Sequence, residues 1–114
     1  MTLDHCKLDV YQRGIELLDQ LDEIYNHMPP GRAHLKDQLD RAGTSIVLNI
    51  AEGAGEFSKD EKQRFYRIAR RSATETAAIL DILERRKAMS PDLIESARDL
   101  VVRVVSMLVR LASQ

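Results

Sequence analysis

The stretch PDLIESARDLVVRVVSMLVRLA, residues 91–112, carries apolar side chains on nearly every side of a helical wheel. Ser90 precedes it as an N-cap residue, Pro91 suits the first helical position, and Asp92 suits the positive end of the helix dipole. The pattern therefore predicts a helix over 91–112. Its apolar positions are Leu93, Ile94, Ala97, Leu100, Val101, Val104, Val105, Leu108, Val109 and Leu111.

Three upstream segments also repeat apolar residues at spacings of three and four, which is typical of helices. They are separated by Met28–Gly31, which contains two prolines, and by Gly53–Gly55, whose two glycines predict a helix end and a turn. Ser58 and Glu61 form a capping box, in which each side chain satisfies the other's backbone N–H group. We predict helices over 8–26, 33–52, 58–86 and 91–112.

These segments predict the fold class. Helices of about 20 residues are rods about 30 Å long, which is the scale of a four-helix bundle. No segment alternates polar and apolar residues as a half-buried strand does. We expect a single all-α domain over 1–114, an antiparallel up-down-up-down four-helix bundle, with Ile46 in its core.

The composition indicates an ordinary globular chain. Its 114 residues are 44% hydrophobic and 31% charged, with a net charge of -1. The single cysteine, Cys6, excludes an internal disulfide and suits a reducing compartment. No apolar run approaches the ~18 residues that a membrane span needs, and the N-terminus does not resemble a signal peptide. We expect a cytoplasmic protein.

The helix predicted over 91–112 has more apolar surface than one stripe of a monomeric bundle uses. Self-association would bury the surplus, and its usual form is a closed symmetric assembly. The alternative is that this helix is buried centrally among the other three. The candidate oligomer interface comprises Leu93, Leu100, Val104, Val105 and Leu108.

Motifs along almost the whole chain resemble one known family. They are LDVYQ (8–12), QLDRA (38–42), SIVLNIAEG (45–53) and RFYRIA (64–69). These motifs are similar to the signature of the four-helix-bundle proteins encoded in 23S rRNA intervening sequences, whose wider family includes the accessory proteins of diversity-generating retroelements. The resemblance implies a four-helix bundle and a ring-shaped homo-oligomer, which is a pentamer in the retroelement relatives. It also implies RNA or DNA, or a protein such as a reverse transcriptase, as partners.

Charge is unevenly distributed along the chain. Residues 1–30 hold two basic and six acidic side chains, a net of -4, whereas residues 55–90 hold nine basic and six acidic ones, a net of +3. Arginines spaced at three and four on one helical face can bind phosphate oxygens. We favour the alternative of a solvated face whose arginines pair with the acidic first helix of the same or a neighbouring subunit. This candidate nucleic-acid or partner face comprises Lys59, Arg64, Arg67, Arg70 and Arg71, and Tyr66 is the only aromatic inside this cluster that could face outward.

A row of polar residues follows the helix predicted over 33–52, at spacings of four, four and three. Such a row is compatible with the wall of an active site. We favour a hydrogen-bonded network between helices or subunits, because the charged ends of the row are about 16 Å apart and cannot pair within one helix. The row comprises Arg41, Ser45, Asn49 and Glu52.

The chain lacks the motifs that would indicate an enzyme. The Glu-x-x-His pairs of di-metal bundles are missing, and Glu23, His27 and His34 are interpreted as surface and cap residues. No phosphate-binding glycine loop or zinc spacing occurs. We therefore expect no enzyme activity, cofactor or metal. The favoured function is a self-associating interaction or scaffold protein, and the alternative is an RNA- or DNA-binding homo-oligomer.

Overall fold

A computed structural model describes residues 3–114, which contain one short 3₁₀ helix and four α-helices, and no strand. The prediction of an all-helical chain with four helices is confirmed. Met1 and Thr2, the first residues of the predicted domain, lie outside the described part. The elements are η1 (Asp4–Lys7), α1 (Asp9–Asn26), α2 (Ala33–Gly55), α3 (Lys59–Arg85) and α4 (Pro91–Ala112).

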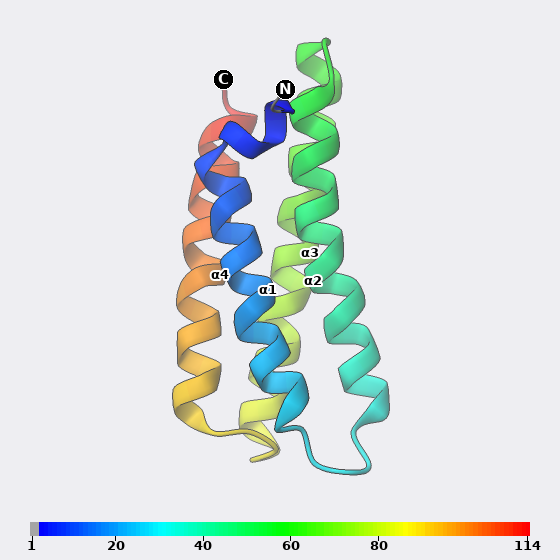
Figure 1. The fold of residues 1–114 in the computed structure, drawn as a ribbon, viewed down its shortest axis with the longest axis vertical. Helices are drawn as coiled ribbons and strands as arrows, with labels where there is room; N and C mark the ends of the chain where they lie inside the picture. Colours follow the sequence, from blue (N-terminus) through cyan, green and yellow to red (C-terminus); the bar gives the residue numbers. More distant parts are fainter. Residues whose placement is uncertain (1–2) are drawn as a thin grey trace.

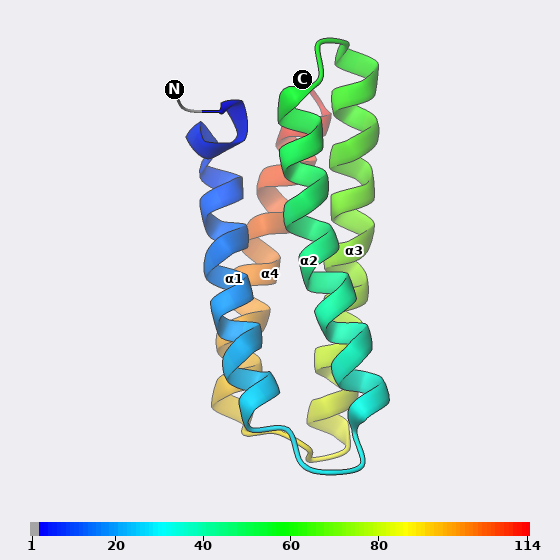
Figure 2. The ribbon, with the colours of Figure 1, turned by 45° about the vertical axis from the view of Figure 1, so that its right-hand side comes forward.

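The four α-helices lie side by side in one bundle (Figures 1 and 2). Helices α2 and α4 each contact both α1 and α3, whereas α1 and α3 make no close backbone contact with each other. Helices α1 and α3 therefore occupy diagonal corners of the bundle. Figure 1 shows successive helices running in alternate directions, with η1 and the C-terminus at the same end of the bundle as the turn between α2 and α3.

One apolar core runs through the bundle, and each helix contributes large side chains to it. Ile46 is completely buried, as the sequence predicts. None of the helices within residues 3–114 is long and apolar enough to cross a membrane. The fully buried aliphatic side chains are Leu17, Leu21 and Ile24 of α1, Leu39, Ile46 and Ile50 of α2, Leu80 and Leu83 of α3, and Ile94, Val104 and Leu108 of α4.

The end of α2 differs from the sequence prediction. The helix predicted to end at Glu52 continues to Gly55, and the turn falls at Glu56–Ser58. Gly53 does not end the helix but allows close packing, because a Cβ atom there would lie 2.7 Å from Cε1 of Tyr66. The glycine with a positive φ is Gly31, at 90°, in the loop between α1 and α2.

Candidate interaction surfaces

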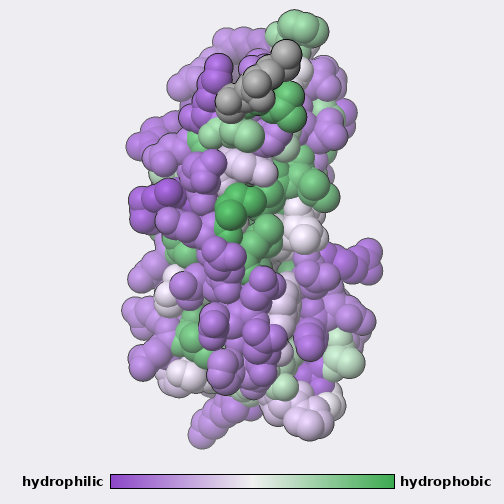
Figure 3. Space-filling view, viewed as in Figure 1, coloured by the Kyte–Doolittle hydropathy of each residue, from purple (hydrophilic) through white to green (hydrophobic). Residues whose placement is uncertain are grey.

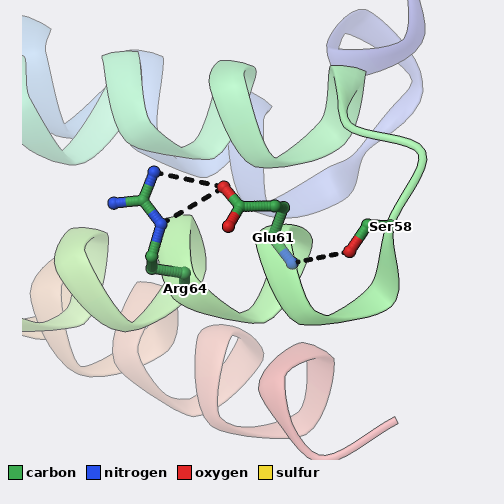
Figure 4. A network of polar contacts seen from close by, with 3 residues as sticks. All are labelled: Ser58, Glu61 and Arg64. Carbon is green, nitrogen blue, oxygen red and sulfur yellow. Dashed lines mark hydrogen bonds and ion pairs between the residues drawn. The ribbon is translucent and has the colours of Figure 1, made fainter.

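The first turn of α3 holds one of the predicted basic residues in place (Figure 4). Ser58 Oγ accepts the backbone N–H of Glu61 at 3.1 Å, which is half of the predicted capping box. The Glu61 side chain does not complete the box. Its Oε2 atom accepts hydrogen bonds from Nε and Nη2 of Arg64, both at 3.2 Å. The Glu61 carboxylate therefore binds the Arg64 guanidinium and not the backbone N–H of Ser58.

The other residues of the predicted basic face are exposed. No acidic residue occurs between Lys62 and Thr74, and Arg67, Arg70 and Arg71 form no ion pair within residues 3–114. These arginines cannot reach the acidic α1 of the same chain, because α1 lies at the diagonal corner of the bundle. The sequence analysis expected these arginines to pair with the acidic first helix of the same subunit or of a neighbouring one. Pairing within the same subunit is therefore wrong.

The sequence left open an outward orientation for Tyr66 on the basic face, and the structure turns this residue inward. Its side chain is only 5% exposed and its ring packs against Gly53 of α2. Burial also raises the pKa of its hydroxyl. Helix α3 turns this position toward the core together with Ala69 and Ala73. The basic face therefore cannot use Tyr66 to stack on nucleic-acid bases.

Part of the predicted polar row forms a hydrogen-bonded network between α2 and α3. Ser45 Oγ lies 2.8 Å from Ser72 Oγ of α3. Asn49 Nδ2 donates to the Ser45 carbonyl at 2.8 Å and to Ser45 Oγ at 3.1 Å. Sequence reasoning missed Ser72, although a small polar residue among the apolar positions of a helix is a signal for such a contact. The network joins the two helices at one defined register.

The two charged members of the row lie outside this network. Arg41 borders a shallow cavity of about 620 Å³ above the two serines, and Glu75 of α3 borders it as well. Glu52 is exposed and does not border the cavity. The two serine hydroxyls bond to each other and to an amide, and none of these groups is a base that would activate a hydroxyl as a nucleophile.

Lys62 was not singled out from the sequence, yet it closes the end of α2. Its Nζ donates to the carbonyl oxygens of Ala54 at 2.9 Å and Gly53 at 3.3 Å. Carbonyl groups in the last turn of a helix lack partners within the helix, and a nearby cation stabilises them. The signal for this contact is a lysine in the first turn of the helix that follows a short connection.

Helix α4 uses much of its apolar surface inside the chain. Val104 and Leu108 are completely buried in the chain's own core, so their assignment to an oligomer interface is wrong. The other three members of that set, Leu93, Leu100 and Val105, are half-buried and pack against the core. The physical reason is that α4 contacts both α1 and α3 and needs a wide apolar face to do so. Its exposed apolar residues are Val102 and Val109.

A second apolar surface lies over the seam between α1 and α2, visible as a green area in the middle of Figure 3. Leu18 and Val47 line the same seam, since a Cβ on Gly43 would lie 3.4 Å from Leu18 Cδ2 and one on Gly14 would lie 3.2 Å from Val47 Cγ2. Leu18 is half-buried at this seam and Val47 is buried, whereas Leu48 of α2, 64% exposed, borders the cavity on the α3 side of that helix.

The predicted cap and surface histidine is found at the end of α1. His27 follows the last residue of this helix, and its Nδ1 lies 2.8 Å from the Glu23 carbonyl oxygen. His34 is exposed in the first turn of α2. In the part of the chain that the structure describes, no three His, Cys, Asp or Glu residues are grouped so that they could hold a metal ion.

These features define an all-helical protein with four long helices around one apolar core, and with charged, polar and apolar surfaces on its outside. Residues 6–110 match the 23S rRNA-intervening sequence protein family, and the chain belongs to this family. Among solved structures, it is similar to a protein of unknown function from the S23 ribosomal protein family of Bacteroides thetaiotaomicron. The TM-score is 0.84 at 22% sequence identity, over 92% of this chain and 96% of that chain, which shows a shared fold. A comparison with curated proteins finds no match.

Proposed function

We propose that this chain is a non-enzymatic scaffold in the cytoplasm, an up-down-up-down bundle that assembles into a ring-shaped homo-oligomer. The observation that carries the proposal is apolar surface outside the core, at Leu48 on α2 and at Val102 and Val109 on α4. Val102 and Val109 lie two helical turns apart on one face of α4, and apolar residues gathered on one face mark contacts with other proteins. The resemblance to the retroelement accessory proteins supports a pentamer as the form of the ring.

Absolute mass in solution tests this proposal. Light scattering at micromolar concentration and low salt is expected to give one species at a whole multiple of 13.0 kDa, and five times this mass for a pentamer. The double variant Leu48→Gln/Val102→Gln is expected to lower the mass while circular dichroism shows unchanged helicity, because both side chains are exposed and outside the core. A wild-type mass of 13.0 kDa throughout the micromolar range would overturn the proposal.

One observation favours a second candidate, an RNA- or DNA-binding homo-oligomer that uses the basic face of α3. The exposed Arg67, Arg70 and Arg71 have no ion-pair partner within residues 3–114 and lie in a stretch without acidic residues. Binding would weaken steeply with salt, and Arg67→Glu/Arg71→Glu would reduce both the affinity and the salt slope. Absent or salt-insensitive binding of a mixed RNA sample would reject this candidate.

A further inference from the structure

Helix α1 presents acidic residues at a regular spacing on its outer surface. Asp19 and Glu23 are exposed and lie one helical turn apart, about 6 Å along the helix axis. From Gly14 to Gly31 the chain contains no lysine or arginine. This part of α1 therefore has an excess of negative charge, and His27, whose Nδ1 lies 4.0 Å from Glu23 Oε2, balances it only when the imidazole is protonated.

Helix α3 presents basic residues at the same spacing. Arg67 and Arg71 are exposed, again one turn apart, and form no ion pair within residues 3–114. The two pairs of opposite charge match in number and in distance along a helix. Since α1 and α3 lie at diagonal corners and make no contact, the two pairs cannot meet inside one chain.

We propose that they meet between copies: the Arg67 and Arg71 face of one copy docks on the Asp19 and Glu23 face of the next. This inference rests on the proposed self-association and names the surface that orients it. Because the two faces lie on opposite corners, one copy offers its acidic face to one neighbour and its basic face to another. The contact is therefore head-to-tail, and such contacts close into rings when the rotation between neighbours permits.

The charges orient this contact, and apolar side chains beside them add buried area. Exposed ion pairs contribute only about 0–1 kcal/mol each, so two of them do not hold copies together alone. Ile15 lies one turn before Asp19 on α1, and Ile68 lies three residues before Arg71 on α3, so each is next to the charged residues of its face. Both isoleucines are half-buried, so each still has solvent-exposed apolar surface that docking would bury. Complementary charges then set the register and exclude like faces from meeting.

Charge reversal tests the contact directly. Arg67→Glu/Arg71→Glu makes both faces acidic, and Asp19→Arg/Glu23→Arg makes both faces basic. Either variant alone is expected to give a mass near 13.0 kDa under conditions where the wild-type chain is an oligomer. The chain with all four substitutions again carries opposite charges on the two faces and is expected to recover the wild-type mass. An equimolar mixture of the two double variants is also expected to assemble, with the variants alternating.

A matched control keeps the charge change and moves it elsewhere. Lys36→Glu/Arg86→Glu also replaces two exposed cations with carboxylates, on α2 and just after α3, and neither cation is in an ion pair within the described residues. This control is expected to assemble like the wild type. Circular dichroism of every variant reports its folding. If a charge-reversed variant does not fold, Arg67→Gln/Arg71→Gln, which removes the two positive charges without reversing them, is expected to lower the mass instead.

The outcomes separate this inference from the proposed function. A monomeric wild-type chain overturns both. A wild-type oligomer whose mass is unchanged by either reversal, or by raising salt from about 50 to about 500 mM, overturns the head-to-tail contact and leaves self-association standing. If the chain with all four substitutions is folded but does not assemble, the head-to-tail contact is also overturned. If Arg67→Glu/Arg71→Glu loses RNA binding while its mass is unchanged, the basic face of α3 binds nucleic acid, and the head-to-tail contact is overturned as well.

Discussion

The two seams of α2 are built from different kinds of contact. Toward α3, the Ser45 and Ser72 hydroxyls form a hydrogen bond at 2.8 Å. The connection between α2 and α3 has only three residues, 56–58. Toward α1, the contact is mainly apolar, with the backbone of Gly43 against the Leu21 side chain; an exposed hydrogen bond from Tyr25 Oη to Asp40 Oδ1 is longer, at 3.5 Å, and the connection spans six residues, 27–32. Hydrogen bonds satisfy their partners at one register, whereas apolar contacts mainly require matching volume. The comparison suggests that the α2–α3 seam sets the alignment of the bundle and the α1–α2 seam adds burial.

The largest expected effect comes from a position that both seams depend on. Ile46 is completely buried on the core side of α2. Ile46→Asp places an unpaired carboxylate there, at a cost of about 3–5 kcal/mol, which is a large part of the stability of a domain this size. We expect loss of cooperative unfolding in urea, followed by circular dichroism. Thr44→Asp, exposed on the same helix, is the control. A helical, cooperatively unfolding Ile46→Asp chain would contradict the core assignment.

The α2–α3 seam has a second feature to break, the close approach at Gly53. An alanine there would bring Cβ to 2.7 Å from the Tyr66 ring, which cannot flex away as a long aliphatic chain does. We expect Gly53→Ala to lower the free energy of unfolding by about 1–3 kcal/mol. At Gly55, two residues on, the same substitution meets no atom within 4 Å and is expected to be neutral or to stabilise the helix by up to about 1 kcal/mol. If Gly53→Ala and Gly55→Ala change the free energy of unfolding equally, the packing of Gly53 against Tyr66 is not tight.

The hydrogen bond across the seam is expected to contribute less. Ser45→Ala removes the bond to Ser72 and is expected to cost about 1 kcal/mol in urea unfolding. Thr44→Ala is the matched control, because the Thr44 hydroxyl bonds only to carbonyl oxygens of its own helix. It is expected to change stability by less than about 0.5 kcal/mol. If the two variants are equally stable, the network does not distinguish this seam from a purely apolar one.

The smallest expected effect is the pH dependence of the α1–α2 seam. Burial, together with the nearby Asp40 and Asp22 carboxylates, raises the pKa of Tyr25 above its ordinary value of 10.0. Above pH 10 the folded chain then binds more protons than the unfolded one, so the free energy of unfolding falls as pH rises. Tyr25→Phe is expected to make this fall shallower in urea titrations between pH 9 and about 11. An unchanged slope would assign the pH dependence to other groups.

The periodic parts of the structure follow from the sequence, and the contacts between helices follow only in part. Apolar spacing places Ile46 in the core, and Ser58 starts α3 where its cap predicts. The spacing does not reveal that Gly53 continues a helix, since a glycine suits both a helix end and a close approach. Nor does it show that Ser72 meets Ser45, because the partner of a polar side chain depends on which helix lies opposite.

The sequence by itself determined four helices, an apolar core and an acidic and a basic segment, because each is a property of residues close together in the chain. Only the tertiary structure decided that α1 and α3 lie at diagonal corners, that Tyr66 turns inward, and that Val104 and Leu108 belong to the core. The reason is rotational: a helix with apolar residues on several sides can bury more than one face. Which face it buries depends on the helices that pack around it.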